Sequence, residues 1–220
     1  MKKATLSLVH KVAPLPSGTP GPHPGLILLH GRGADEEDLL GLTPFIDPRF
    51  LIIAVRAPFQ FPYGGYTWYE MLADAAPEPT GFSESYERLV KFIGEVPERY
   101  PVDPGRLFLL GFSMGTVMSY GFALTKPRNI RGIVAHSGYI PESSTLSFDL
   151  QNLSGTAFFI AHGIHDPVID VQFARRAKDL LSGTQATVSY KEYPILHSMS
   201  EESIGDCAAW LCRHLESGTD

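Results

Sequence analysis

Residues 106–124 read RLFLLGFSMGTVMSYGFAL, and this stretch decides the fold. The apolar run at 107–110 is typical of a strand buried on both faces, and the residues from Met114 to Leu124 predict a helix. Between them lies GFSMG at 111–115, a G-x-S-x-G motif centred on Ser113. A strand that passes through this motif into a helix is the setting of a nucleophile elbow, a sharp turn that exposes the serine Oγ.

Similar apolar runs recur along the chain, each bounded by glycine or proline, at 26–29, 51–55, 133–135 and 157–161. Segments with helical spacing separate them, for example at 89–96 and 174–181. Strands that alternate with helices predict an α/β fold with a mostly parallel central sheet. A final amphipathic helix is expected after His197, with a capping box at Ser198 and Glu201.

A serine hydroxyl is a weak nucleophile at neutral pH, so it needs a base that is itself oriented by an acid. Active sites of open α/β sheets form at the carboxyl ends of strands, where both partners should therefore lie. Asp166 follows the run at 157–161, and His197 follows a β-rich run at 187–193. We therefore predict a triad of Ser113, His197 and Asp166. Asp170 is the alternative acid, although it is better suited to cap a helix.

A tetrahedral intermediate also needs two backbone donors for its oxyanion. One is expected to be the amide of Met114, directly after the nucleophile. The other is expected in HGRG at 30–33, a glycine-rich turn after an early strand, where the backbone amide of Arg32 is the candidate. The motif and these two amides together predict acyl-transfer chemistry.

The segment from 57 to 82 is rich in proline, glycine and aromatic residues and shows neither a helical nor a strand period. A loop of this length is typical of a lid or of a pocket wall. Trp68, Met71 and Phe82 of this segment, together with Phe112 and Tyr139, are the candidates for lining an acyl or alcohol pocket. Packing in the core is the alternative for each of them.

The charge pattern excludes several classes of function. The chain has 24 acidic and 18 basic residues, a net charge of -6, and no basic run that would indicate a nucleic-acid partner. No stretch approaches the ~20 apolar residues that a membrane span needs. The lysines at the start resemble a signal peptide, but the apolar stretch after them is short and broken, which favours a strand.

Other reactive side chains are expected to be structural. Cys207 and Cys212 lie five apart in one predicted helix, which favours buried, reduced thiols over a disulfide or a metal pair. The acidic triplet at 36–38 is expected in the first turn of a helix. Four histidines lack the spacing of metal ligands, so we expect hydrogen-bonded structural roles and no metal at His30, His136, His162 and His165.

These features together resemble the carboxylesterase, phospholipase and acyl-protein thioesterase family of small α/β-hydrolases, over nearly the whole chain. The matching pieces are HGRG at 30–33, the aromatic loop with Trp68 and Tyr69, GFSMG at 111–115, the HG and DPV pieces at 162–168, and His197 before the last helix. The resemblance implies the α/β-hydrolase fold, a sheet with helices on both faces, and the triad and oxyanion amides given above.

The chain departs from the common family pattern at three positions. Many members have Gln after the nucleophile and a small residue two places beyond it, whereas this chain has Met114 and Thr116. Many also have an aliphatic residue in place of Arg32. Both oxyanion contacts are made by the main chain, so the mechanism is expected to survive, but the shape of the pocket is expected to differ.

The sequence therefore predicts a single-domain serine hydrolase, residues 1–220, that cleaves carboxylic esters or thioesters through an acyl-enzyme without a cofactor. Small esters are favoured as substrates, because no surface-seeking amphipathic helix and no basic patch for lipid is evident. A lysophospholipase or an acyl-protein thioesterase is the alternative within the class, and a catalytically silent binding protein is the alternative outside it. We expect a cytoplasmic location, and the sequence leaves a homodimer open.

Overall fold

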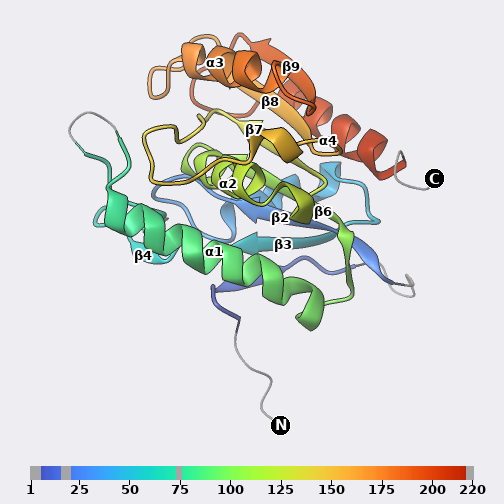
Figure 1. Ribbon diagram of the computed structural model, residues 1–220. Coiled ribbons are helices and arrows are strands. Elements are labelled where there is room, and N and C mark those ends of the chain that lie inside the picture. The colour runs from blue at the N-terminus through green and yellow to red at the C-terminus, as the bar shows by residue number, and fades with distance from the viewer. Residues whose placement is uncertain (1–5, 16–20, 73–75, 217–220) are drawn as a thin grey trace.

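The computed structural model describes residues 6–15, 21–72 and 76–216 (Figure 1). Its centre is a seven-stranded sheet in the order β1-β3-β2-β6-β7-β8-β9. Neighbouring strands are parallel, except that β1 pairs antiparallel with β3 at one edge. The strands are β1 (His10–Val12), β2 (His23–Leu29), β3 (Leu51–Val55), β6 (Val102–Phe112), β7 (Gly132–His136), β8 (Ala157–Gly163) and β9 (Thr187–Tyr193).

Helices connect the parallel strands, as the alternating pattern predicts. The α-helices are α1 (Pro79–Arg99), α2 (Met114–Thr125), α3 (Val171–Ser182) and α4 (Glu201–Glu216), and the short 3-10 helices are η1 (Asp38–Phe45), η2 (Pro127–Asn129) and η3 (Leu150–Asn152). The carboxylate of Asp170 accepts a hydrogen bond from the amide of Gln172 and caps α3. Its predicted capping role is confirmed.

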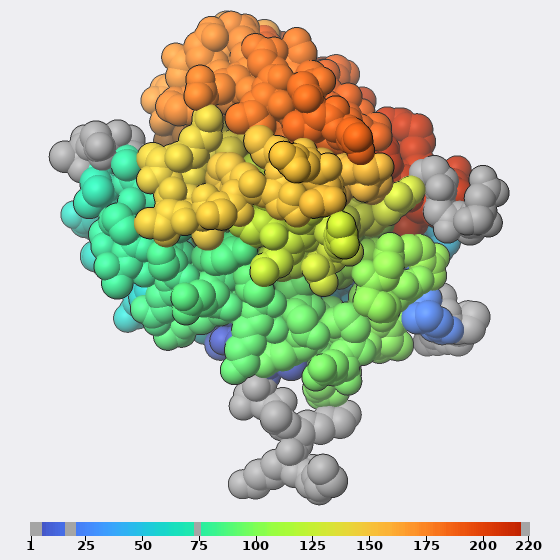
Figure 2. Space-filling model, viewed as in Figure 1, coloured from blue at the N-terminus to red at the C-terminus, as the bar shows by residue number. Residues whose placement is uncertain are grey.

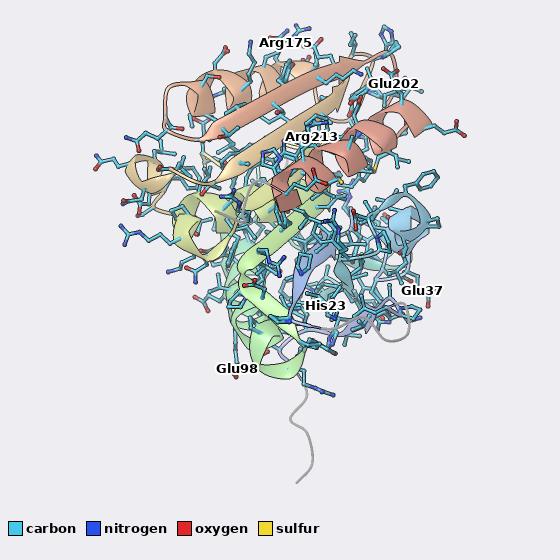
Figure 3. All side chains as sticks on the ribbon, turned by 90° about the vertical axis from the view of Figure 1, so that its right-hand side faces the viewer. His23, Glu37, Glu98, Arg175, Glu202 and Arg213 are labelled. Atoms are coloured by element: carbon cyan, nitrogen blue, oxygen red, sulfur yellow. The ribbon has the colours of Figure 1, made fainter. Side chains whose placement is uncertain are left out.

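Two cores lie on the two faces of the sheet, because successive side chains of a strand point to opposite sides. Ile27 and Leu29 of β2 pack into the core that α1, α2 and α3 cover. Leu26 and Leu28 pack into the other core, which α4 and η1 cover. The apolar runs are therefore central strands buried on both faces. Figure 1 shows α1 and α2 in front of the sheet, and Figure 3 shows α4 with Glu202 and Arg213 labelled.

The carboxyl ends of three central strands meet at one edge of the sheet. Phe112 at the end of β6 lies opposite His136 at the end of β7, and His136 lies opposite Ala161 near the end of β8. Gly163 ends β8 opposite Tyr193, the last residue of β9. The loops that leave β6, β8 and β9 therefore start along the same edge of the sheet, and these loops carry the three predicted triad residues.

Three local predictions need correction. The segment 57–82 contains a small hairpin, β4 (Phe59–Gln60) with β5 (Tyr66–Thr67), and its last residues belong to α1. The helix starts early because proline is well tolerated at the first helical position, and Pro79 occupies it. The capping box of α4 consists of Ser200 and Ser203, whose hydroxyls accept each other's backbone amides at 3.1 and 2.9 Å, rather than of Ser198 and Glu201.

The third correction concerns Glu36 of the acidic triplet at 36–38, since Asp38 lies in the first turn of η1 as predicted. Glu36 is buried and forms two hydrogen bonds of 2.6 Å with the guanidinium of Arg56, so an ion pair and not a helix dipole accounts for it. The strand predicted at the start of the chain falls partly on residues 1–5, which lie outside the described residues; β1 begins at His10. No helix in the described ranges is long and apolar enough to cross a membrane.

Candidate active site

Ser113 occupies a tight turn between β6 and α2, as the motif predicts. Its backbone has φ 55° and ψ -119°, in the left-handed half of conformational space that residues with a Cβ rarely adopt. Gly111 makes this turn possible, because a Cβ on Gly111 would lie 2.5 Å from the backbone of Gly115. Thr116 fastens the turn, since its Oγ1 lies 2.7 Å from the carbonyl oxygens of both Gly111 and His136.

A chain of hydrogen bonds runs from the serine to the predicted acid. The Nε2 atom of His197 lies 3.0 Å from the Oγ of Ser113, and its Nδ1 atom lies 2.6 Å from Oδ2 of Asp166. The ring of Phe112 packs against the imidazole of His197 with ring centroids 5.0 Å apart. The imidazole is therefore held between a hydroxyl and a carboxylate in the arrangement that general-base activation of a serine requires.

Asp166 is held by backbone donors as well as by the imidazole. Its Oδ1 accepts hydrogen bonds from the amides of Val168 and Ile169 at 2.8 and 2.9 Å. Burial alone would raise the pKa of Asp166, but the hydrogen bonds from Ile169, His197 and Val168 outweigh burial and lower this pKa. The carboxylate therefore stays ionised beside the imidazole. The alternative acid, Asp170, is exposed and caps α3 instead.

The glycine-rich turn at 30–33 lies against the nucleophile. A Cβ built on Gly31 would lie 3.3 Å from the Cβ of Ser113. The turn is fixed by three hydrogen bonds of His30: its ring accepts the amide of Ala57 at 3.0 Å, its Nδ1 donates to Gly31 at 2.6 Å, and its carbonyl accepts the indole N–H of Trp68 at 2.9 Å. Burial lowers the pKa of His30, so the ring is neutral and can accept.

The predicted oxyanion donors belong to this turn and to the start of α2. Arg32 follows Gly31 in the turn, and Met114 follows Ser113 at the start of α2. Within the described ranges, the amide of neither residue donates to another protein atom. The start of a helix favours negative charge at its unpaired N–H groups. Two unpaired amides next to a nucleophile can stabilise a developing oxyanion.

A cavity of about 410 Å³ opens beside Ser113. Its walls come from the loop after β5, from the start of α2, from the loop after β7 and from α3 with the loop before it. Figure 2 shows the loop after β7, in yellow, between α1 and α3 on one face of the molecule. The lining side chains are mostly apolar or aromatic and include Tyr69, Met71, Met114, Val117, Tyr139, Ile140, Val168, Ile169 and Phe173, together with the polar residues Arg32, Glu142, Ser143 and Arg176.

Met71 and Tyr139 line the cavity, whereas three other pocket candidates lie elsewhere. Trp68 is fully buried, and its indole holds the carbonyl of His30. Phe82 is buried behind Tyr69, with ring centroids 5.4 Å apart, and Phe112 packs against His197. These three aromatic residues pack against His30, Tyr69 and His197 and so hold residues of the site in place. They are absent from the cavity wall because their side chains point toward the core or the imidazole.

Several residues of the cavity wall were not predicted. Tyr69 lines the cavity and places its hydroxyl 3.5 Å from that of Tyr139. Phe173 of α3 contacts Tyr139 of the loop after β7, with ring centroids 5.4 Å apart. The guanidinium of Arg176, also in α3, forms an ion pair with Glu142 of the same loop. The aromatic composition of the loop at 57–82 already indicated Tyr69. Nothing in the sequence pointed to α3 as a wall of the pocket.

Most of the remaining reactive residues have structural partners, whereas His165 is exposed, so its expected hydrogen-bonded role is not supported. His136 is buried, with its two ring nitrogens 2.9 and 3.1 Å from the hydroxyls of Ser137 and Ser203. Cys207 is buried, whereas Cys212 is only half-buried, with its Sγ 3.6 Å from Asp47, so the expectation of two buried thiols is corrected for Cys212. Among the residues that the structure describes, no three His, Cys, Asp or Glu side chains are grouped as ligands for a metal.

Residues 15–215 match the family model described as phospholipase/carboxylesterase. The chain belongs to this family. It is 25% identical over 187 residues to the putative hydrolase MhqD of Bacillus subtilis, covering 84% of this chain and 90% of the relative. It is 29% identical over 208 residues to acyl-protein thioesterase 1 of Yarrowia lipolytica, covering 84% of this chain and 89% of the relative.

Solved structures show the fold. The Bacillus cereus carboxylesterase superposes with a TM-score of 0.83 and 23% identity, covering 94% of each chain. The carboxylesterase from Mesorhizobium loti superposes with a TM-score of 0.80 and 22% identity, over 94% of this chain and 95% of the other. The predicted α/β-hydrolase fold, with a mostly parallel sheet flanked by helices on both faces, is thereby confirmed.

Proposed function

We propose that this chain is a serine hydrolase that cleaves small carboxylic esters through an acyl-enzyme, with Ser113 as nucleophile, His197 as base and Asp166 as orienting acid. The observation that carries the proposal is the chain of hydrogen bonds from the Oγ of Ser113 through the imidazole to Asp166, of 3.0 and 2.6 Å. Membership of the phospholipase/carboxylesterase family supports ester hydrolysis as the reaction.

The reaction starts when the Oγ of Ser113 attacks the ester carbonyl carbon and passes its proton to Nε2 of His197. The carbonyl oxygen becomes an oxyanion, which the amides of Arg32 and Met114 hold. The imidazolium then protonates the leaving alcohol, and the acyl group stays on Ser113. Water, deprotonated by the same imidazole, attacks the acyl-enzyme and releases the acid. Asp166 keeps the imidazole oriented and stabilises its charged form.

The cavity supports a small or medium-sized substrate with an apolar part. Its volume of about 410 Å³ lies in the usual range for small-molecule pockets, and apolar side chains dominate its walls. Relatives that carry the name acyl-protein thioesterase make thioesters the alternative substrate class. The same triad would serve both classes, because the attacked group is a carbonyl in each case.

The test compares the native protein with Ser113→Ala on p-nitrophenyl esters from acetate to decanoate. Loss of a triad nucleophile should lower kcat by about 10⁶. A fluorophosphonate probe should label Ser113 at one site per chain, as read by mass spectrometry. Activity that survives in Ser113→Ala would contradict the mechanism. A native protein that hydrolyses no ester or thioester and resists the probe would favour a binding protein with this fold.

A further inference from the structure

A second histidine, His162, lies next to the predicted acid. His162 is the next-to-last residue of β8 and is fully buried. Its Nε2 lies 2.8 Å from the carbonyl oxygen of Ile169 and 3.4 Å from Oδ2 of Asp166. Its Nδ1 has no hydrogen-bond partner within the described residues. A carbonyl oxygen can only accept, so Nε2 carries a proton, and in the neutral ring Nδ1 carries none.

His162 closes the short loop that carries the acid. The amide of Ile169 donates to Oδ1 of Asp166, and the carbonyl of the same residue accepts from His162. Ile169 is therefore held from both sides, and the loop from 166 to 169 is fixed to the end of β8. The Nε2 atom of His162 also lies 3.4 Å from Oδ2, the oxygen that His197 contacts at 2.6 Å. One carboxylate oxygen thus lies between two imidazoles.

We propose that His162 is a positioning residue of this site, whose Nε2–H fixes the loop of Asp166 and keeps its Oδ2 directed at the imidazole of His197. The assignment rests on the proposed hydrolase function. His162 touches neither the serine nor the cavity, so it acts only through Asp166. The geometry requires a neutral donor, because a second positive charge beside Oδ2 would compete with the imidazolium that forms on His197 during the reaction.

The surroundings of His162 keep it neutral. Burial lowers its pKa, against the opposing effect of the hydrogen bond with the carbonyl of Ile169. The charged and titratable groups around it are Asp166 and Asp170 on the acid loop, His197 on the base loop, His136 on the neighbouring strand β7 and Glu192 on the neighbouring strand β9. His162 should therefore remain an uncharged donor at neutral pH.

The decisive variants are His162→Leu, which removes the donor, and His162→Gln, whose side-chain amide can donate from a similar position. We expect His162→Leu to lower kcat/KM about 10- to 100-fold, as a displaced catalytic group does. Its acid limb in the pH profile of kcat/KM should move to lower pH, because a misdirected carboxylate stabilises the imidazolium less. For His162→Gln, log(kcat/KM) should lie at least halfway from the value of His162→Leu back to the native value. The acid limb of its pH profile should return to the native position.

Controls separate this role from a merely structural one. His165→Leu makes the same change at an exposed neighbour and should stay within about twofold of the native kcat/KM. Native kcat/KM and an unmoved acid limb in His162→Leu would overturn the assignment, as would a Gln variant as impaired as the Leu variant. Activity that survives in Ser113→Ala would instead overturn the proposed function itself, so the two failures are distinguishable.

One measurement needs no variant and covers the case in which His162→Leu does not fold. Long-range ¹⁵N–¹H correlation spectra of the native protein report the tautomer of each histidine. We expect the Nε2–H tautomer for His162, constant from pH 5 to pH 8. An Nδ1–H tautomer, or protonation of both nitrogens in this range, would contradict the role assigned to His162.

Discussion

Gly115 and Leu29 approach each other so closely that a Cβ on Gly115 would lie 1.9 Å from the carbonyl oxygen of Leu29. The same Cβ would lie 2.8 Å from the carbonyl oxygen of His30. The second turn residue of the elbow therefore sits directly on the end of β2, where the turn carrying the amide of Arg32 begins. This contact, together with that of Gly31 with Ser113, positions the nucleophile against the turn that carries the predicted oxyanion donor.

We expect Gly115→Ala to lower kcat at least 10²-fold and to destabilise the fold by about 1–3 kcal/mol, because backbone atoms must move to admit the methyl group. Ester hydrolysis and urea unfolding measure the two effects. Gly94→Ala in α1 is the matched control, since nothing lies within 4 Å of its Cβ position. It should keep native kinetics and gain about 0.5–1 kcal/mol. Similar behaviour of the two variants would contradict the importance of the contact.

The two candidate acids can be compared directly by amide substitution. Asp166→Asn removes the negative charge and offers the wrong hydrogen-bonding partner to Nδ1 of His197, so kcat should fall about 10⁴-fold, as in other serine triads. Asp170→Asn should keep kcat within about twofold, because Asn caps a helix as well as Asp does. A large loss in the second variant and a small one in the first would exchange the two roles.

The buried His136 predicts how stability depends on pH. Burial is the main cause that lowers the pKa of His136 to about 3 in the folded protein. In the unfolded chain it takes up a proton near pH 6.5, so between about pH 6.5 and pH 3 the unfolded state holds more protons and stability falls as pH falls. From pH 7 to pH 5 this one group should cost about 2 kcal/mol.

Urea unfolding of the native protein and of His136→Gln at pH 7 and pH 5 checks this expectation. The variant should be less stable at pH 7, because the hydrogen bonds to Ser137 and Ser203 are weakened. It should nevertheless lose less stability on acidification, because glutamine does not titrate. Parallel losses in the two proteins would show that His136 does not remain neutral in the folded state.

Trp68 and Tyr139 should affect different kinetic constants. Trp68→Phe removes the hydrogen bond to the carbonyl of His30 but leaves the cavity wall intact, so kcat should fall for all esters with an unchanged chain-length profile. Tyr139→Ala enlarges the cavity, so KM and the preferred chain length should shift. The p-nitrophenyl ester series measures both effects. A changed chain-length profile in Trp68→Phe would place its indole in the substrate pocket after all.

The sequence predicted the strands, their common edge and the helix cap at Asp170 best, because each of these features depends on a local pattern. Apolar runs bounded by glycine or proline are typical of strands covered on both faces, and the sheet contains them. The prediction that Ser113, Asp166 and His197 lie together followed from strand ends that share one edge, and hydrogen bonds join the three side chains. The choice of Asp166 over Asp170 rested on the capping preference of Asp170, which α3 uses.

Sequence reasoning was least successful where distant segments meet. Trp68, Met71 and Phe82 all look suited to a pocket, but only packing decides that Met71 lines the cavity while Trp68 and Phe82 do not. Phe173 lines the cavity because α3 lies beside the loop after β7. No local sequence pattern predicts that these two segments are neighbours. The shift of the α4 cap to Ser200 has a similar origin, because Ser203 also has to reach His136.

The backbone at Ser113, with its φ of 55°, has a consequence for how this protein can evolve. A residue held in such a conformation typically costs about 1–3 kcal/mol of stability, and glycine would adopt it with little cost. Selection for the persistence of the fold alone would therefore favour replacement of Ser113 by glycine. In a lineage without selection for hydrolysis, Ser113 is expected to be among the first site residues replaced. That replacement would raise the stability of the fold.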